Sequence, residues 1–170
     1  MATLQKKICM LGAYGVGKTS LVKRYVHSIF SEKYLSTVGV KIDKKVLKAD
    51  GHDLTLMLWD LYGEDSFQKI QQTYLKGTAG FLLIVDGTRL PSLTTAMNLR
   101  NLVFGIAGPV PYLVVINKCD LRPDWEIKQS HLDELRAGGD TVIVASAKTG
   151  EGVPDAFTQL SVLLVKANRA

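Results

Sequence analysis

The sequence predicts a single three-layer α/β domain, in which a mostly parallel sheet of six strands lies between helices and an antiparallel hairpin forms one edge. Short continuous apolar runs alternate with stretches of helical periodicity, which is typical of parallel strands covered on both faces. Two further runs are joined by a two-residue turn, which makes that pair antiparallel. The chain of 170 residues is 46% hydrophobic and suits one domain spanning 1–170. No apolar run reaches a membrane-spanning length, so we expect a cytoplasmic protein.

The first strand and the first helix flank a glycine-rich loop. Residues 8–11 form an apolar run, residues 21–29 have helical spacing, and GAYGVGKT lies between them at 12–19. Glycines let the loop close around a phosphate, and the following helix directs its positive dipole end at the anion. Lys18 is expected to reach the β- and γ-phosphates, and the Thr19 hydroxyl to ligate Mg²⁺. The alternative is a glycine-rich turn with a surface lysine.

The edge hairpin follows in the sequence. Apolar and charged residues alternate over 40–46, Asp50-Gly51 supplies a turn, and the return strand covers 54–59. Ile42 and Trp59 lie in these two strands.

The second half of the chain predicts three more strands and three helices. The strands are continuous apolar runs at 81–85, 112–116 and 142–145. The helices are expected over 93–106, 127–135 and 153–167, with Ser92 as the N-cap of the first and Pro154 in the first turn of the last.

A second polar motif, Asn117-Lys118-Cys119-Asp120, follows one of these strands. Guanine presents two N–H donors on one edge, and a carboxylate such as Asp120 can accept both, whereas adenine offers no such pair. A polar strand-end turn is the alternative explanation. An ATP-dependent phosphotransferase that shares only the phosphate loop is a competing function. Asp120 argues against it, because its carboxylate suits guanine rather than adenine.

The charge pattern and the cysteine content argue against a nucleic-acid-binding protein, a cysteine metal site and a disulfide-rich fold. The net charge is +5, but the lysines are scattered and do not interleave with aromatic residues, so no nucleic-acid partner is expected. Cys9 and Cys119 have neither metal-ligand spacing nor a disulfide framework.

The chain resembles a Ras-like small GTPase, and most of all the Rab branch, over residues 7–166. Beside the two motifs above, residues 34–40 resemble the first switch, 58–64 the second, and 146–148 the loop that closes over guanine. The resemblance implies a P-loop G domain with about five helices. It also implies a switch that cycles between GTP and GDP with Mg²⁺ and has GTPase activity.

The resemblance further implies roles for individual residues. Mg²⁺ would be held by Thr19, Thr37 and, through a water, Asp60, while the amides of Thr37 and Gly63 would contact the γ-phosphate. The implied catalytic set is Lys18, Thr37, Gly63 and Glu64. The implied nucleotide contacts are Tyr14, Gly15, Val16, Gly17, Lys18, Thr19, Ser20, Phe30, Tyr34, Thr37, Gly63, Asn117, Lys118, Asp120, Ser146, Ala147 and Lys148.

Four of these contacts have a specific expected partner. Phe30 would pack against guanine, Tyr34 would cover the phosphates, Lys118 would run along the base, and the Ala147 amide would meet the base carbonyl. The alternatives are that the two aromatics are ordinary loop residues and that Thr37 merely starts a strand.

Two departures from the family pattern concern hydrolysis. The family usually has Gln where this chain has Glu64, and a carboxylate offers no hydrogen-bond donor for the γ-phosphate. Tyr14 stands where the family has a small residue and would crowd the γ-phosphate. The second switch also reads Leu61-Tyr62 in place of the usual Thr-Ala. Slow intrinsic hydrolysis is therefore expected, unless Tyr14 turns into solvent or an activator supplies a glutamine.

Partner surfaces are expected at residues 34–45 and 59–76, for effectors, exchange factors and activating proteins. Ile42, Trp59 and Tyr74 match apolar effector positions, although core packing is a rival explanation for Trp59. A monomer is expected. Residues 166–170 carry no prenylation cysteine, so membrane association would require a lipidated tail or a recruiting partner. A hydrolysis-deficient scaffold that holds GTP or GDP is the alternative function.

Overall fold

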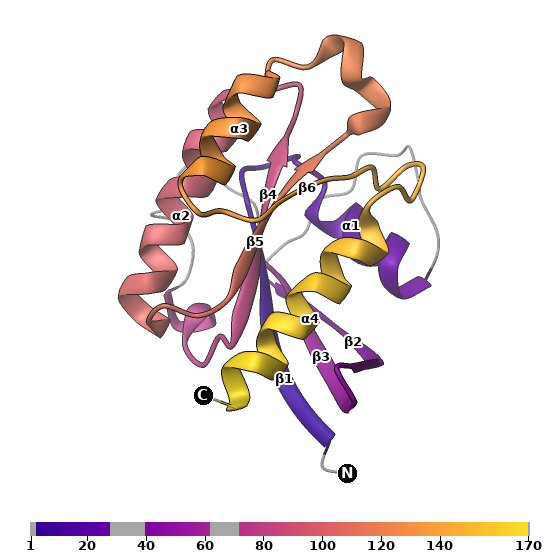
Figure 1. The fold of residues 1–170 in the computed structure, drawn as a ribbon, viewed down its shortest axis with the longest axis vertical. Helices are drawn as coiled ribbons and strands as arrows, with labels where there is room; N and C mark the ends of the chain where they lie inside the picture. The colour runs from indigo at the N-terminus through magenta and orange to yellow at the C-terminus, as the bar shows by residue number, and fades with distance from the viewer. Residues whose placement is uncertain (1–2, 28–39, 62–71, 170) are drawn as a thin grey trace.

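The computed structural model describes residues 3–27, 40–61 and 72–169 (Figure 1). Within these residues six strands form one sheet in the order β2-β3-β1-β4-β5-β6, and only the β2–β3 pair among them is antiparallel. The strands are β1 Thr3–Leu11, β2 Val40–Ala49, β3 His52–Leu61, β4 Gly80–Asp86, β5 Tyr112–Asn117 and β6 Val142–Val144. The predicted mixed sheet with an edge hairpin is confirmed.

Helices cover both faces of the sheet, which makes three layers (Figure 1). The described residues form α1 Lys18–His27, η2 Gln72–Leu75, α2 Pro91–Ala107, η3 Cys119–Asp124, α3 Gln129–Ala137 and α4 Val153–Arg169, of which η2 and η3 are 3-10 helices. None of these helices has the length and apolar character needed to cross a membrane.

Strand β1 shows why the core divides into two halves. Successive side chains of a strand point to opposite faces. Ile8 and Met10 belong to the cluster packed with α1 and α4, whereas Cys9 and Leu11 belong to the cluster packed with α2 and α3. All four are buried. The continuous apolar run therefore serves both faces of a central strand, as the sequence predicted.

The hairpin turn has the geometry that its residues favour. Asp50 and Gly51 both have positive φ angles, 51° and 77°, and Ala49 pairs with His52 across the turn. Two consecutive residues of positive φ form the type I′ turn that joins twisted strands, and Asp-Gly is a preferred sequence for it. The predicted turn is confirmed.

The predicted N-cap of α2 is wrong. Leu90 occupies the N-cap position and Pro91 follows it at the start of the helix, so Ser92 lies inside the first turn. The buried Ser92 hydroxyl accepts the Asp86 N–H at 2.9 Å and donates to the Arg89 carbonyl at 2.7 Å. The helix begins at Pro91 because proline lacks an N–H and suits the first helical position. Ser92 therefore does not cap the helix, and its hydroxyl instead connects β4 to the turn before α2.

Helix α3 begins two residues later than predicted. Ile127 is buried but precedes the helix, which starts at Gln129. The His131 ring accepts the Lys128 N–H at 2.8 Å, and this bond satisfies a donor at the helix start.

Candidate nucleotide-binding site

The phosphate loop joins β1 to α1 at the carboxyl edge of the parallel strands. Gly15 and Gly17 have φ angles of 77° and 104°, in the region that favours glycine. A Cβ atom on Gly17 would lie 2.3 Å from Asn117 Nδ2, and one on Gly12 would lie 2.4 Å from the Ile84 carbonyl oxygen. The glycines are therefore required both by backbone conformation and by close packing.

Lys18 lies at the start of α1 with its side chain folded over the loop. Its Nζ donates to the carbonyl oxygens of Gly12 and Ala13, each at 3.0 Å. The residue is only 6% exposed. This burial lowers the pKa of Lys18 to about 8, and the charge of Asp60 opposes the shift. The negative charge of a phosphate bound in the loop would favour the charged ammonium group and so raise the pKa of Lys18 again.

Two predicted magnesium ligands are in direct contact. The Thr19 hydroxyl, in the first turn of α1, donates to the carboxylate of Asp60, which is buried near the end of β3. Hydroxyl and carboxylate oxygens are the hard ligands that Mg²⁺ prefers. The residues present therefore fit a magnesium ion beside the phosphate loop.

Asn117, at the end of β5, connects the two halves of the site. Its Nδ2 donates to the Val16 carbonyl at 2.9 Å, and its Oδ1 accepts the Ala147 N–H at 3.1 Å. The predicted contact of Ala147 with a base carbonyl stays a prediction, because here its N–H is directed at Asn117. Both loops are fixed relative to β5 by one buried amide.

Lys118 adopts a left-handed conformation, with φ at 72°. Its Nζ donates to the Gly15 carbonyl at 3.2 Å and to Asp86 Oδ2 at 2.8 Å. The Trp125 indole N–H donates to the Lys118 carbonyl at 2.8 Å. The aliphatic stem of the lysine is thereby stretched from β5 towards the phosphate loop.

Asp120 lies on the exposed side of the base region. Its Oδ1 accepts the Ser146 hydroxyl at 2.7 Å, and that same hydroxyl oxygen accepts the Thr149 N–H at 3.1 Å. The carboxylate is therefore anchored through one oxygen. The predicted base loop, residues 146–148, thus lies against the Asn117-Asp120 motif.

The structure adds two residues that the sequence reasoning missed. Asp86 is buried at the end of β4 and pairs with Lys118, and its position directly after an apolar run could have drawn attention to it. Arg24 of α1 donates through Nε to the Ala147 carbonyl at 2.7 Å and through Nη2 to the Lys148 carbonyl. No local sequence signal marks Arg24, because its partners are more than 120 residues away.

Five predicted site residues lie outside the described residues: Phe30, Tyr34, Thr37, Gly63 and Glu64. Their roles stay predictions. Tyr14 is described and is 40% exposed.

The predicted effector positions lie next to one another. Ile42 is 45% exposed and pairs with Trp59 across the hairpin. The rings of Trp59 and Tyr74 have centroids 6.4 Å apart, and Lys7 Nζ lies 3.9 Å from the centre of the Trp59 ring. Trp59 is half-buried, so it both packs on the core and contributes to the surface.

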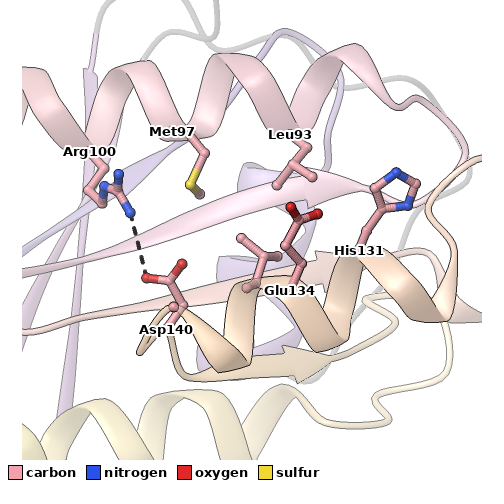
Figure 2. Close-up of a pocket in the computed structure, with 8 residues that line it drawn as sticks. Leu93, Met97, Arg100, His131, Glu134 and Asp140 are labelled. Atoms are coloured by element: carbon pink, nitrogen blue, oxygen red, sulfur yellow. Dashed lines mark ion pairs between the residues drawn. The ribbon is translucent and has the colours of Figure 1, made fainter.

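A separate hollow of about 240 Å³ lies between α2 and α3 (Figure 2). Arg100 pairs with Asp140 at 3.7 Å inside it, and Asp140 also accepts the Tyr112 hydroxyl. None of the residues that line it belongs to the phosphate or base loops.

The chain is similar in sequence to known proteins. The Ras family model matches residues 7–166. Rab-32 of Mus musculus is 34% identical over 135 residues, which cover 76% of this chain and 60% of the relative. Rab-8B of Bos taurus is 30% identical over 166 residues, which cover 96% and 80%. Rab-1C of Dictyostelium discoideum is 31% identical over 160 residues, which cover 91% and 78%.

The match therefore spans nearly all of this chain, but only 60% of the length of Rab-32. The chain belongs to the Ras family of small GTPases and resembles its Rab branch.

Proposed function

We propose that this chain is a guanine-nucleotide switch, which binds GTP and GDP with Mg²⁺ and recruits effectors in its GTP form. The observation that carries the proposal is the amide of Asn117. It bonds to the phosphate loop through Val16 and to the base loop through Ala147. A ligand with a phosphate chain at one end and a base at the other would suit this arrangement of the two loops.

The chemistry at each end specifies the ligand further. Lys18 and the N-terminus of α1 favour a polyphosphate, and Thr19 with Asp60 would hold its Mg²⁺. The Mg²⁺ would offset phosphate charge and supply Lewis acidity at the oxygen atoms it binds. Asp120, anchored by Ser146, would accept the two N–H donors of guanine.

Nucleotide selectivity tests the binding proposal. The dissociation constants of GDP and ADP would be measured by competition against a fluorescent GDP analogue with Mg²⁺ present. We expect GDP to bind at least about a hundredfold more tightly, because adenine lacks the two N–H donors that the Asp120 carboxylate would accept. Equal affinity for the two nucleotides would exclude a guanine-specific site and favour a phosphotransferase that uses ATP.

The proposed switch hydrolyses GTP slowly. This part of the proposal rests on residue chemistry: Glu64 has acceptors but no donor, and Tyr14 adds a phenol beside the phosphate loop. Single-turnover hydrolysis would be measured for the native chain, for Glu64→Gln and for Tyr14→Gly. We expect each substitution to raise the rate, and the double substitution to raise it most. A fast native rate that neither substitution increases would contradict the proposal.

Effector recruitment would involve the partly exposed group formed by Ile42, Trp59 and Tyr74. Ile42 follows the first switch segment, Trp59 lies in the second and Tyr74 follows it, so the GTP-dependent ordering of those segments would change the surface that a partner meets. Binding to a partner would therefore be expected to depend on the nucleotide.

A further inference from the structure

Arg89 contacts the phosphate loop from outside the recognised motifs. Its Nη2 donates to the Tyr14 carbonyl oxygen at 2.6 Å. Asn117 and Lys118 hold the next two carbonyls of the loop, as described above. Three successive carbonyls on the outer side of the loop thus each accept a donor from another part of the chain.

The Arg89 side chain is itself held at a fixed position. Its Nε lies 3.1 Å from Asp86 Oδ2, and the Asp86 side chain is 2% exposed. Burial alone would raise the pKa of Asp86, but the donors of Lys118 and Thr88 outweigh it and hold that pKa below its usual value. The carboxylate therefore stays ionised, and the planar guanidinium spans it and the Tyr14 carbonyl.

The geometry of the peptide bond gives this contact a consequence inside the loop. A trans peptide is planar, so the carbonyl of one residue and the N–H of the next point in opposite directions. Holding the Tyr14 carbonyl outward therefore directs the Gly15 N–H inward, towards the side on which the loop would receive phosphates. A hydrogen bond to the carbonyl also polarises the peptide and strengthens that N–H as a donor.

We infer that Arg89 is a positioning residue for the diphosphate part of the nucleotide. It acts through the Tyr14–Gly15 peptide and is fixed in place by Asp86. The inference rests on the nucleotide-binding function proposed above and adds a residue to it. No sequence motif indicates this role, because Arg89 lies in the turn between β4 and α2.

The test compares GDP with GMP in competition binding to the whole chain with Mg²⁺. GMP lacks the β-phosphate and so uses fewer of the N–H donors of the loop. We expect Arg89→Ala to weaken GDP binding about tenfold, the effect of losing one charge-assisted hydrogen bond, and GMP binding by less than about threefold. Arg100→Ala is the matched control. It removes a guanidinium of α2 that faces Asp140 in the separate hollow (Figure 2), and should leave both affinities unchanged.

The outcomes separate the inference from the function on which it rests. An equal loss for GDP and GMP would mean a general structural role, and no loss for GDP would mean no role; either result overturns the inference. A native chain without saturable GDP binding would instead reject the proposed function. Arg89→Gln keeps part of the side chain and one donor group, and would replace the alanine variant in the same comparison if that variant did not fold.

Discussion

Asp120→Asn is expected to exchange guanine specificity for xanthine specificity. In the structure, one carboxylate oxygen accepts the Ser146 hydroxyl at 2.7 Å. An asparagine placed there keeps its oxygen on Ser146 and turns its NH₂ group towards the base. That group is a donor and would face the N–H donors of guanine. Xanthine has a carbonyl where guanine has its amino group, so it would accept the new donor.

The expected loss of GDP affinity follows from two contributions. A hydrogen bond to a charged group contributes about 1.5–3 kcal/mol, and a donor left without an acceptor costs about 1–3 kcal/mol. Together these contributions of about 2.5–6 kcal/mol predict a loss of roughly 60-fold to 20,000-fold, since about 1.4 kcal/mol corresponds to a factor of ten. Xanthosine diphosphate should gain affinity over the native chain.

Competition against a fluorescent nucleotide would measure both affinities. Asp124→Asn is the control, because Asp124 is an exposed aspartate of the same short helix, η3. If Asp120→Asn left the preference between guanine and xanthine unchanged, Asp120 would not read the base, and the assignment of the base site would be wrong.

Two further predictions concern the phosphate loop. Because the pKa of Lys18 is lowered to about 8 by burial, and a bound phosphate would raise it, GDP affinity should be constant below that pH and fall as the pH rises above it. Dissociation constants from pH 6.5 to 9.5 would check this against Lys18→Arg, whose charge persists; identical profiles would refute the assignment. Gly17→Ala should abolish GDP binding, because its Cβ would lie 2.3 Å from Asn117 Nδ2 at a φ of 104°. Gly139→Ala has a similar φ of 101° with open space around it, and should lose stability by about 1–2 kcal/mol but keep its GDP affinity, as measured by thermal unfolding and nucleotide competition.

Local chemistry predicted much of the fold. The Asp50-Gly51 turn and the apolar runs needed no knowledge of distant residues, because turn geometry and strand burial are read directly from adjacent positions. The error at Ser92 has a local cause as well. Serine is a good N-cap, but Pro91 suits the first helical position, so the helix starts two residues earlier than predicted and the Ser92 hydroxyl instead braces the turn after β4.

The residues of the candidate site that belong to a sequence motif could be predicted from the sequence. Lys18, Thr19 and Asn117 stand in recognisable patterns, and the structure brings them to one edge of the sheet. Arg24 carries no such mark, and Asp86 has only its position directly after an apolar run. The roles of both depend on which elements become neighbours in the fold. Their contacts join residues 123 and 32 positions apart, respectively.

The single amide that serves both loops has a consequence for how the ligand would be held and released. A whole nucleotide would contact both loops at once, whereas a fragment carrying only a base, or only a phosphate chain, would contact one of them. Each fragment should therefore bind far more weakly than its share of the whole nucleotide. Because Asn117 bonds to both loops, a regulator that displaces either the phosphate loop or the base loop would weaken nucleotide binding at both.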